Sequence, residues 1–141
     1  NPPPDFSTTV VPLLSPTPCS VRIVEKSDLF AGKMHAVLYR KWKGRVKGRD
    51  WYDFIWYVKE KIPLNLAHLE SRIRQSGDYQ SKDSLNEAMF LKLLMDRIDA
   101  VDFESAKTDV EPFLKDKATL NLWNNDFFKA LSKNIVFEKG V

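Results

Sequence analysis

The placement of proline constrains this chain more than any other feature of its sequence. Six of the eight prolines lie within the first 18 of the 141 residues. Proline and the residue before it both resist helix, so this stretch is expected to be extended. The next segment, Ser20–Glu25, alternates apolar and polar side chains with the period of a half-buried strand. Because an isolated pair of strands is marginally stable, we expect residues 1–26 to be an extended or β lead-in from a sheet further upstream in a longer protein.

The pattern after residue 26 is helical. Apolar side chains recur at helical spacing from Phe30 to Leu38, and Asp50–Ile62 is apolar nearly all round, which is typical of a helix buried on every side. Gly44 and Gly48 interrupt this pattern and indicate a basic loop over residues 42–49. The expected helix-capping residues are Ser27, Asn65, Ser84, Asp102 and either Asn124 or Asn125. The sequence therefore predicts a mainly α (α+β) chain, in which residues 27–141 form a bundle-like helical domain behind a short N-terminal β element.

The composition excludes several classes of protein. The single cysteine, Cys19, rules out an internal disulfide and any zinc site with several cysteines. His35 and His68 have no neighbouring metal-ligand motif, so metal ligation is not expected of them. No apolar run approaches the roughly 20 residues that span a membrane, and no signal-peptide core is present. We expect a soluble, cytoplasmic protein that does not contact a membrane.

The charges are unevenly distributed along the chain. No acidic residue occurs between Ala31 and Arg49, and the end of this stretch carries six cations, namely Arg40, Lys41, Lys43, Arg45, Lys47 and Arg49. Acidic residues predominate between Asp83 and Asp116. A basic cluster of this kind is typical of a surface that faces nucleotide or nucleic-acid phosphates. A solvated loop that binds nothing explains the cluster equally well.

Lys33 is the first candidate functional residue. Lys33, Ala36 and Arg40 share one helical face, and the small neighbours Gly32 and Ala36 leave room beside the lysine. Glycine inside a helix costs about 1 kcal/mol relative to alanine, which suggests close approach of a backbone or a ligand. A lysine with space around it can act as a point charge on phosphate. The alternative is a surface lysine on an amphipathic helix.

Asp50 and Asp53 form the second candidate, three residues apart and hence on one face of a helix. Paired carboxylates can bind Mg²⁺ or accept a proton. Aspartate is also favoured at a helix N-terminus, and residue type and position alone favour Asp50 as a cap paired with Arg49. Asp53 lies further inside an apolar helix, where a charge without a partner is costly. For Asp53 the functional and the structural interpretation both stay open at this point.

Together these segments resemble the AbiEii/AbiGii nucleotidyltransferase family, the toxins of type IV abortive-infection toxin–antitoxin pairs. The resemblance is carried by Asp28-Leu29-Phe30-Ala31-Gly32-Lys33-Met34-His35-Ala36-Val37-Leu38 and by Arg49-Asp50-Trp51-Tyr52-Asp53-Phe54. Lys33 matches the lysine of the family's third motif. Asp50 matches the aspartate of its fourth motif, with Asp53 adjacent in the same pattern. Residues 64–70 and 109–113 also resemble one subgroup.

The resemblance implies a DNA-polymerase-β-like nucleotidyltransferase fold followed by a helical C-terminal region. The implied activity is transfer of a nucleotide from an NTP with Mg²⁺, in some members to the 3′ end of tRNA, and the implied protein partner is a cognate antitoxin. By the same resemblance Lys33 would contact the nucleotide phosphates, and Asp50 would orient or activate the acceptor or organise the lysine. The family's first two motifs, which supply metal-binding acidic residues, have no match here. We therefore expect no metal ligand in this chain, and expect it to be a C-terminal part that is inactive alone.

Helix geometry limits how Lys33 and Asp50 can share a site. If the first helix ended at Lys41, about 12 Å of helix would follow Lys33. A simple antiparallel hairpin would then place Lys33 level with Trp56 or Tyr57, and a shared site with Asp50 would need steeply crossing helices or a folded-back loop.

The first alternative function is a helical module that binds RNA or protein through the 40–49 loop. The second is a domain that docks an antitoxin through its acidic helices.

Overall fold

The computed structural model describes residues 8–12, 20–41 and 45–138. Strand β1 (Thr8–Pro12) pairs antiparallel with β2 (Ser20–Val24), with Thr8 opposite Val24 and Pro12 opposite Ser20. Only Glu25 separates β2 from the first helix. Everything that follows in the described chain is helical apart from connections and one isolated bridge between Leu64 and Phe137.

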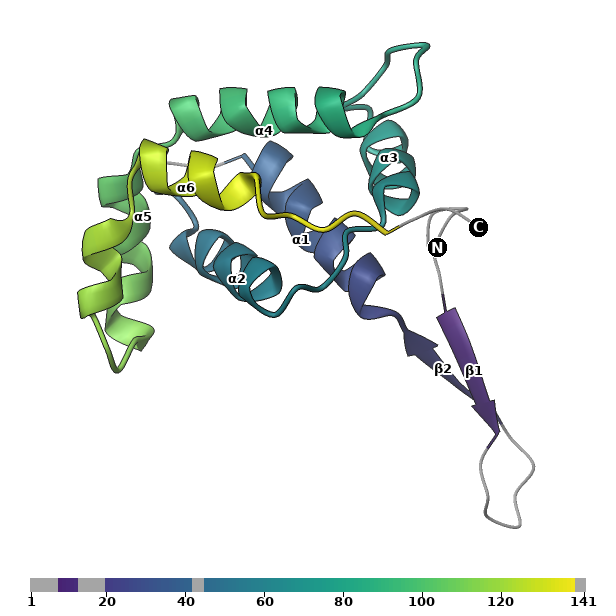
Figure 1. The fold of residues 1–141 in the computed structure, drawn as a ribbon, viewed down its shortest axis with the longest axis horizontal. Helices are drawn as coiled ribbons and strands as arrows, with labels where there is room; N and C mark the ends of the chain where they lie inside the picture. The colour runs from purple at the N-terminus through teal and green to yellow at the C-terminus, as the bar shows by residue number, and fades with distance from the viewer. Residues whose placement is uncertain (1–7, 13–19, 42–44, 139–141) are drawn as a thin grey trace.

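Six α-helices and two short 3₁₀ helices are described, and they confirm the prediction of a mainly helical chain (Figure 1). Their bounds are α1 Lys26–Tyr39, α2 Gly48–Lys59, α3 Leu66–Gln75, α4 Glu87–Ala100, α5 Phe103–Val110, η1 Glu111–Phe113, η2 Ala118–Leu122 and α6 Asn125–Ser132. Helix α1 packs on α2, α3 and α4, whereas α2 packs on α5 and α6. The pair α1–α2 therefore lies at the centre of the helical part.

An aromatic cluster joins α2 to the C-terminal helices. Phe128 of α6 stacks on Phe103 of α5 with ring centroids 4.7 Å apart, and it meets the edges of Trp51 and Trp123 at 5.2 and 5.4 Å. Phe54 stacks on the same ring at 6.2 Å. All five side chains are buried, and aromatic pairs in these geometries contribute beyond the area that they bury. This cluster fixes one face of α2 against α5 and α6.

Three predicted helix caps are confirmed. The side chains of Asn65, Asp102 and Asn124 each accept a hydrogen bond from a backbone N–H in the first turn of the helix that follows. Asn65 also donates its amide to Oδ1 of Asp28 at 2.7 Å, and both side chains are buried. The start of α3 is thereby joined to the first turn of α1.

Two predicted caps are wrong. Helix α1 begins one residue before Ser27, whose hydroxyl donates instead to Glu138 at 3.0 Å from the far end of the chain. Helix α4 is capped by Asn86 rather than by Ser84, with its side chain accepting from the backbone N–H of Met89 at 2.8 Å. At Ser27 a tertiary partner replaces the local capping bond, and a local sequence pattern does not reveal such a partner.

The prediction that α2 is buried on every side is also wrong. Trp51 and Phe54 are fully buried, but the side of α2 that carries Tyr52 and Trp56 is open, and these two residues are 42% and 46% exposed. The helix also runs from Gly48 to Lys59 rather than from Asp50 to Ile62. Because α1, α5 and α6 cover only part of its circumference, an aromatic stripe remains at the surface.

Gly48 is the first residue of α2. The prediction that it belongs to a basic loop is therefore wrong. A Cβ atom at this position would lie 1.9 Å from the backbone carbonyl oxygen of Ala106 in α5. The absence of a side chain therefore allows α2 and α5 to approach closely. Gly32 differs, since a Cβ there would lie 3.6 Å from the Arg72 guanidinium, an ordinary contact. The close backbone approach that the sequence suggested at Gly32 occurs at Gly48.

These two glycines give a matched test of the packing. We expect Gly48→Ala to lower the free energy of unfolding by about 2 kcal/mol, because the added methyl group must displace α5 backbone. Gly32→Ala should raise it by up to about 1 kcal/mol, because alanine is the better helix former and has room. Urea unfolding monitored by circular dichroism measures both. Equal effects of the two substitutions would contradict this account of the α2–α5 contact.

Candidate functional site

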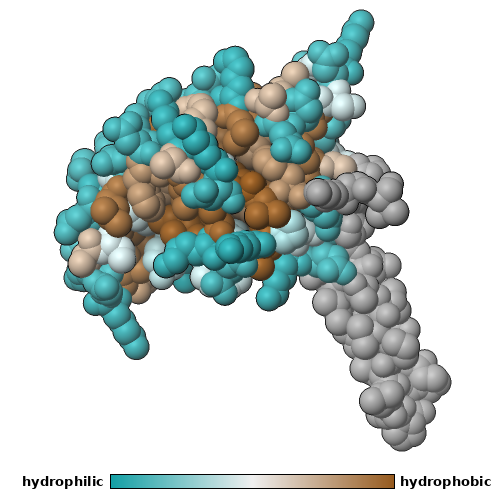
Figure 2. Space-filling view, in the orientation of Figure 1, coloured by the Kyte–Doolittle hydropathy of each residue, from teal (hydrophilic) through white to brown (hydrophobic). Residues whose placement is uncertain are grey.

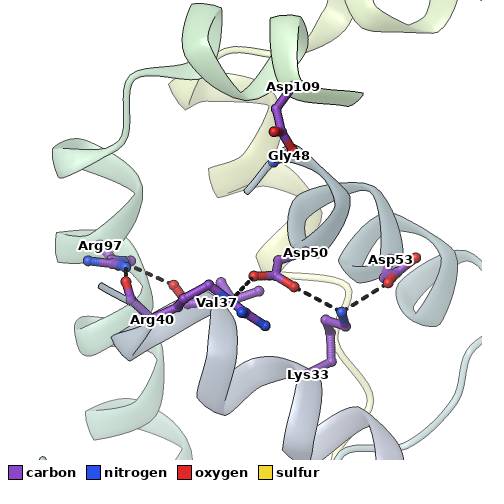
Figure 3. Close-up of polar contacts among 8 residues, drawn as sticks. All are labelled: Lys33, Val37, Arg40, Gly48, Asp50, Asp53, Arg97 and Asp109. Carbon is purple, nitrogen blue, oxygen red and sulfur yellow. Dashed lines mark hydrogen bonds and ion pairs between the residues drawn. The ribbon is translucent and has the colours of Figure 1, made fainter. Parts of the chain in front are cut away.

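Lys33 lies between two carboxylates of the neighbouring helix (Figure 3). Its Nζ atom is 2.9 Å from Oδ1 of Asp50 and 2.9 Å from Oδ2 of Asp53. The lysine comes from α1 and both aspartates come from the first half of α2. The structure thus brings together the three residues that the sequence indicated as candidates for catalysis.

Arg40, the residue that follows α1, completes the group. Its Nε atom is 2.7 Å from Oδ2 of Asp50, so each oxygen of this carboxylate has its own cation. We call Lys33, Arg40, Asp50 and Asp53 the ionic cluster; its two positive and two negative formal charges balance. The Asp50 side chain is only 7% exposed, whereas Lys33 and Asp53 are 21% and 38% exposed. The cluster therefore has a buried centre and an accessible edge.

Lys33 carries a positive charge at neutral pH. Burial lowers the pKa of its ammonium group, but hydrogen bonds and Coulombic attraction from Asp50 and Asp53 outweigh this and leave the pKa above its usual value. Tyr57 is close to the same groups, and burial, partly offset by the charge of Lys33, raises the pKa of its hydroxyl. Lys33 is therefore suited to act as a fixed positive charge and not as a general base.

The contacts between α1 and α2 show how the candidates meet. Phe30 stacks on Tyr57 with centroids 4.8 Å apart, Lys33 meets Asp53, and Arg40 meets Asp50. Later residues of α1 thus pair with earlier residues of α2, as in an antiparallel hairpin. A simple hairpin would have placed Lys33 level with Trp56 or Tyr57, whereas its ion pairs are with Asp53 and Asp50, which lie nearer the start of α2. The Nζ atom of Lys33 thus reaches two carboxylates that are three residues apart on one face of α2.

Two other arginines of the basic segment have partners outside the ionic cluster. Nε of Arg45 is 2.7 Å from Oδ1 of Asp109 in α5, and the guanidinium carbon of Arg49 lies 5.8 Å from the ring centre of Phe113. Lys47 is exposed, and Lys43 falls outside the described residues. Arg40, Arg45 and Arg49 therefore contact three different partners within the fold.

The described residues do not fit a Mg²⁺ site. Among them no three His, Cys, Asp or Glu side chains lie close enough together to hold a metal ion. Asp50 and Asp53, the paired carboxylates of the sequence, are both held by cations, and their ion pairs oppose the binding of a further cation. His35 lies against Asp78 and Ser76 at 3.4 and 3.3 Å, in a surface hydrogen-bond group.

Sequence patterns did not indicate a groove on the open side of α2. Its volume is about 660 Å³, and it lies between α2, the two 3₁₀ helices and α6. Apolar and aromatic residues dominate its lining, among them Tyr52, Ile55, Trp56, Phe113, Leu122 and Phe127. Figure 2 shows hydrophobic residues gathered between α2 and α6 within a hydrophilic rim. The sequence signal for this groove was the large apolar side chains around α2. Their pattern alone had suggested that all of them belong to the hydrophobic core.

The two aspartates should differ in their contributions to stability. We expect Asp50→Asn to lower the free energy of unfolding by about 2 kcal/mol, because it leaves two cations beside a buried neutral amide. Asp53→Asn should cost less than about 1 kcal/mol, since its carboxylate is more exposed and has one cationic partner. Urea titration of both variants measures the difference. A cost for Asp53→Asn as large as that for Asp50→Asn would contradict the assignment of Asp50 as the centre of the cluster.

Comparison with known protein families matches nearly the whole chain to a family model. The family model described as nucleotidyl transferase AbiEii toxin, type IV TA system, covers residues 1–133. Comparisons with curated proteins and with solved structures found no match. No helix in the described part of the chain is both long enough and apolar enough to cross a membrane.

Proposed function

Because the chain belongs to the AbiEii family of nucleotidyl transferase toxins of type IV toxin–antitoxin systems, we propose that it takes part in nucleotide transfer from an NTP through Lys33, Asp50 and Asp53. One observation carries this proposal. Lys33 and Asp50 stand 17 residues apart in sequence, in two segments that resemble different family motifs, and their side chains meet at 2.9 Å.

Lys33 is proposed to bind the phosphates of the NTP. Its charge is fixed, and its side chain remains partly accessible at the edge of the cluster. A fixed cation placed where phosphate charge develops stabilises the transition state without reorganising during the reaction. An incoming phosphate competes with the carboxylates for the ammonium group, and the more exposed Asp53 is the partner that is easier to displace.

The two aspartates are proposed to have different roles. Asp50 has both oxygens held by cations and is buried, so it is suited to organising Lys33 and Arg40. Asp53, once its lysine turns to phosphate, is free to accept a proton from the acceptor hydroxyl. The oxygen of the acceptor hydroxyl then attacks the α-phosphorus of the NTP. The bond between the α-phosphorus and the oxygen that bridges to the β-phosphate breaks, and pyrophosphate leaves. Mg²⁺ would be bound by the NTP phosphates, because the described residues offer no set of ligands for it. The roles proposed for Asp50 and Asp53 do not require contact with the metal ion.

The acceptor is proposed to be the 3′ end of a tRNA, and an antitoxin protein is proposed as the partner of the whole system. Tyr52 and Trp56 lie within one turn of Asp53 on α2, and both are exposed at the groove. Exposed aromatic side chains stack with unpaired bases and show little preference for base sequence. This placement supports a single-stranded acceptor end beside Asp53.

The test measures transfer of label from α-³²P-labelled NTPs to tRNA by the full-length protein. We expect Lys33→Met and Asp53→Asn each to lower the initial rate by about 100-fold or more. Asp53→Asn is the sharper variant, because its expected cost in stability is small. Lys92→Met, which removes an exposed cation of α4 paired with Asp96, is the control and should label at the unsubstituted rate.

Circular dichroism of each variant separates loss of activity from loss of folding. If folded Lys33→Met and Asp53→Asn both label tRNA at the unsubstituted rate, the cluster is only a structural ion-pair network. If only Lys33→Met is inactive, the role proposed for Asp53 is wrong, and the role of the lysine stands.

A second candidate function is RNA binding by the basic segment without transfer. The exposed side chains of Lys47 and Arg49 at the N-terminus of α2 favour it. Filter binding of tRNA across a salt series tests it, since contacts to phosphate weaken steeply as salt rises. We expect Lys47→Met with Arg49→Met to reduce the salt dependence. Binding that does not respond to salt would exclude this candidate.

A further inference from the structure

The C-terminal end of α1 is held by a residue from α4. Arg97 donates from Nε to the backbone carbonyl of Val37 at 2.9 Å and from Nη2 to that of Arg40 at 2.5 Å (Figure 3). The last carbonyls of a helix have no partner within the helix, and the macrodipole makes a cation favourable there. Arg97 therefore fixes the last turn of α1 through two bonds from one planar group.

The N-terminal end of α2 is held in the same way, with the opposite charge. Oδ2 of Asp109 in α5 accepts the backbone N–H of Gly48 at 2.9 Å, and its Oδ1 pairs with Nε of Arg45 at 2.7 Å. The Asp109 side chain is 9% exposed. A carboxylate at a helix N-terminus satisfies a free N–H and interacts favourably with the dipole.

Both contacts act on backbone that directly carries the ionic cluster. The carbonyl that Arg97 holds belongs to Arg40, whose own guanidinium reaches Asp50. The N–H that Asp109 holds belongs to Gly48, two residues before Asp50. Between these points the chain runs through the connection from Arg40 to Lys47. The two contacts therefore anchor the end of α1 to α4 and the start of α2 to α5.

We propose that Arg97 and Asp109 are positioning residues that set the offset between α1 and α2 at which Lys33 and Arg40 meet Asp50. Neither residue needs to touch a nucleotide for this role, because each acts through the backbone. The inference rests on the proposed function for its effect on catalysis, but its effect on the cluster itself can be measured without any activity.

The shape of Arg97 matters as well as its charge. A guanidinium presents several N–H groups in a rigid plane and can serve two carbonyls at once, whereas a lysine is a flexible point charge. Arg97→Lys should therefore restore part of what Arg97→Met removes. A misplacement of about 1 Å at a reacting group can cost about 100-fold in rate, so a modest shift of α1 is expected to be visible in turnover.

The kinetic test compares Arg97 with Arg74, which makes similar contacts elsewhere. Arg74 also donates to two backbone carbonyls, those of Ser81 at 2.7 Å and Asp83 at 2.8 Å, in the connection before α4. We expect Arg97→Met to lower kcat for labelling by about tenfold or more with a smaller change in KM for the NTP, and Arg97→Lys to recover part of it. Arg74→Met should keep kcat although it removes these two bonds and an ion pair with Glu70.

The second test needs no activity. The shift in urea midpoint caused by Asp50→Asn is measured in three backgrounds: unsubstituted, Arg97→Met and Arg74→Met. Arg97 binds the carbonyl of Arg40, and the guanidinium of Arg40 binds Asp50, so a smaller shift in the Arg97→Met background reveals coupling through the end of α1. The shift in the Arg74→Met background should equal the unsubstituted one. Additive shifts in both backgrounds overturn the inference.

The outcomes separate this inference from the proposed function. Coupling between Arg97 and Asp50 together with normal labelling by Lys33→Met would retain the positioning role and reject the catalytic one. Loss of labelling in Lys33→Met, with Arg97→Met behaving like Arg74→Met, would do the reverse. If Arg97→Met does not fold, Arg97→Lys and Asp109→Asn take its place, since the asparagine still offers an acceptor to Gly48.

Discussion

The carboxylate of Asp50 is the constraint on which the site depends. An ionised carboxylate this deeply buried is costly unless cations and hydrogen bonds replace the water that it loses. Lys33 lies in α1 and Arg40 directly follows it, so satisfying this one carboxylate fixes α1 against α2. The neighbouring Trp51 points into the aromatic cluster that joins α2 to α5 and α6. A polar constraint on one side of α2 and an apolar one on the other thus hold the same helix in place.

Much of this arrangement could be predicted from local sequence, but the placement of α1 relative to α2 could not. Helical spacing and the family resemblance indicated Lys33, Asp50 and Asp53, and side-chain chemistry indicated the caps at Asn65 and Asp102. The level at which the two helices meet depends on tertiary contacts such as the stacking of Phe30 on Tyr57. Spacing along one helix contains no information on such contacts, so the sequence alone did not show that Lys33 reaches Asp50.

The basic segment illustrates the same limit for charge. A run of cations in sequence is ambiguous because their partners need not be near in sequence, and Asp109 belongs to a helix that begins more than fifty residues after Arg45. In the structure Arg40 and Arg45 are each bound to a largely buried carboxylate. Gly48, which looked like a loop residue, is a point of close helix contact. Charges that resembled a phosphate-binding surface therefore partly serve to connect α1, α2 and α5.

The balance of charge within the ionic cluster suggests how one arrangement serves both stability and chemistry. If Asp50 depended on Lys33 alone, drawing the lysine toward phosphate would leave a buried carboxylate without a cation, at a cost of several kcal/mol. Arg40 removes this difficulty, because it holds the second oxygen of Asp50 whatever Lys33 does. The contact that can be exchanged is then the one with Asp53, whose exposed carboxylate is solvated by water when released. Arg40 thus keeps the buried centre neutral while Lys33 changes partner, and it can do so only as long as the end of α1 that carries it stays fixed.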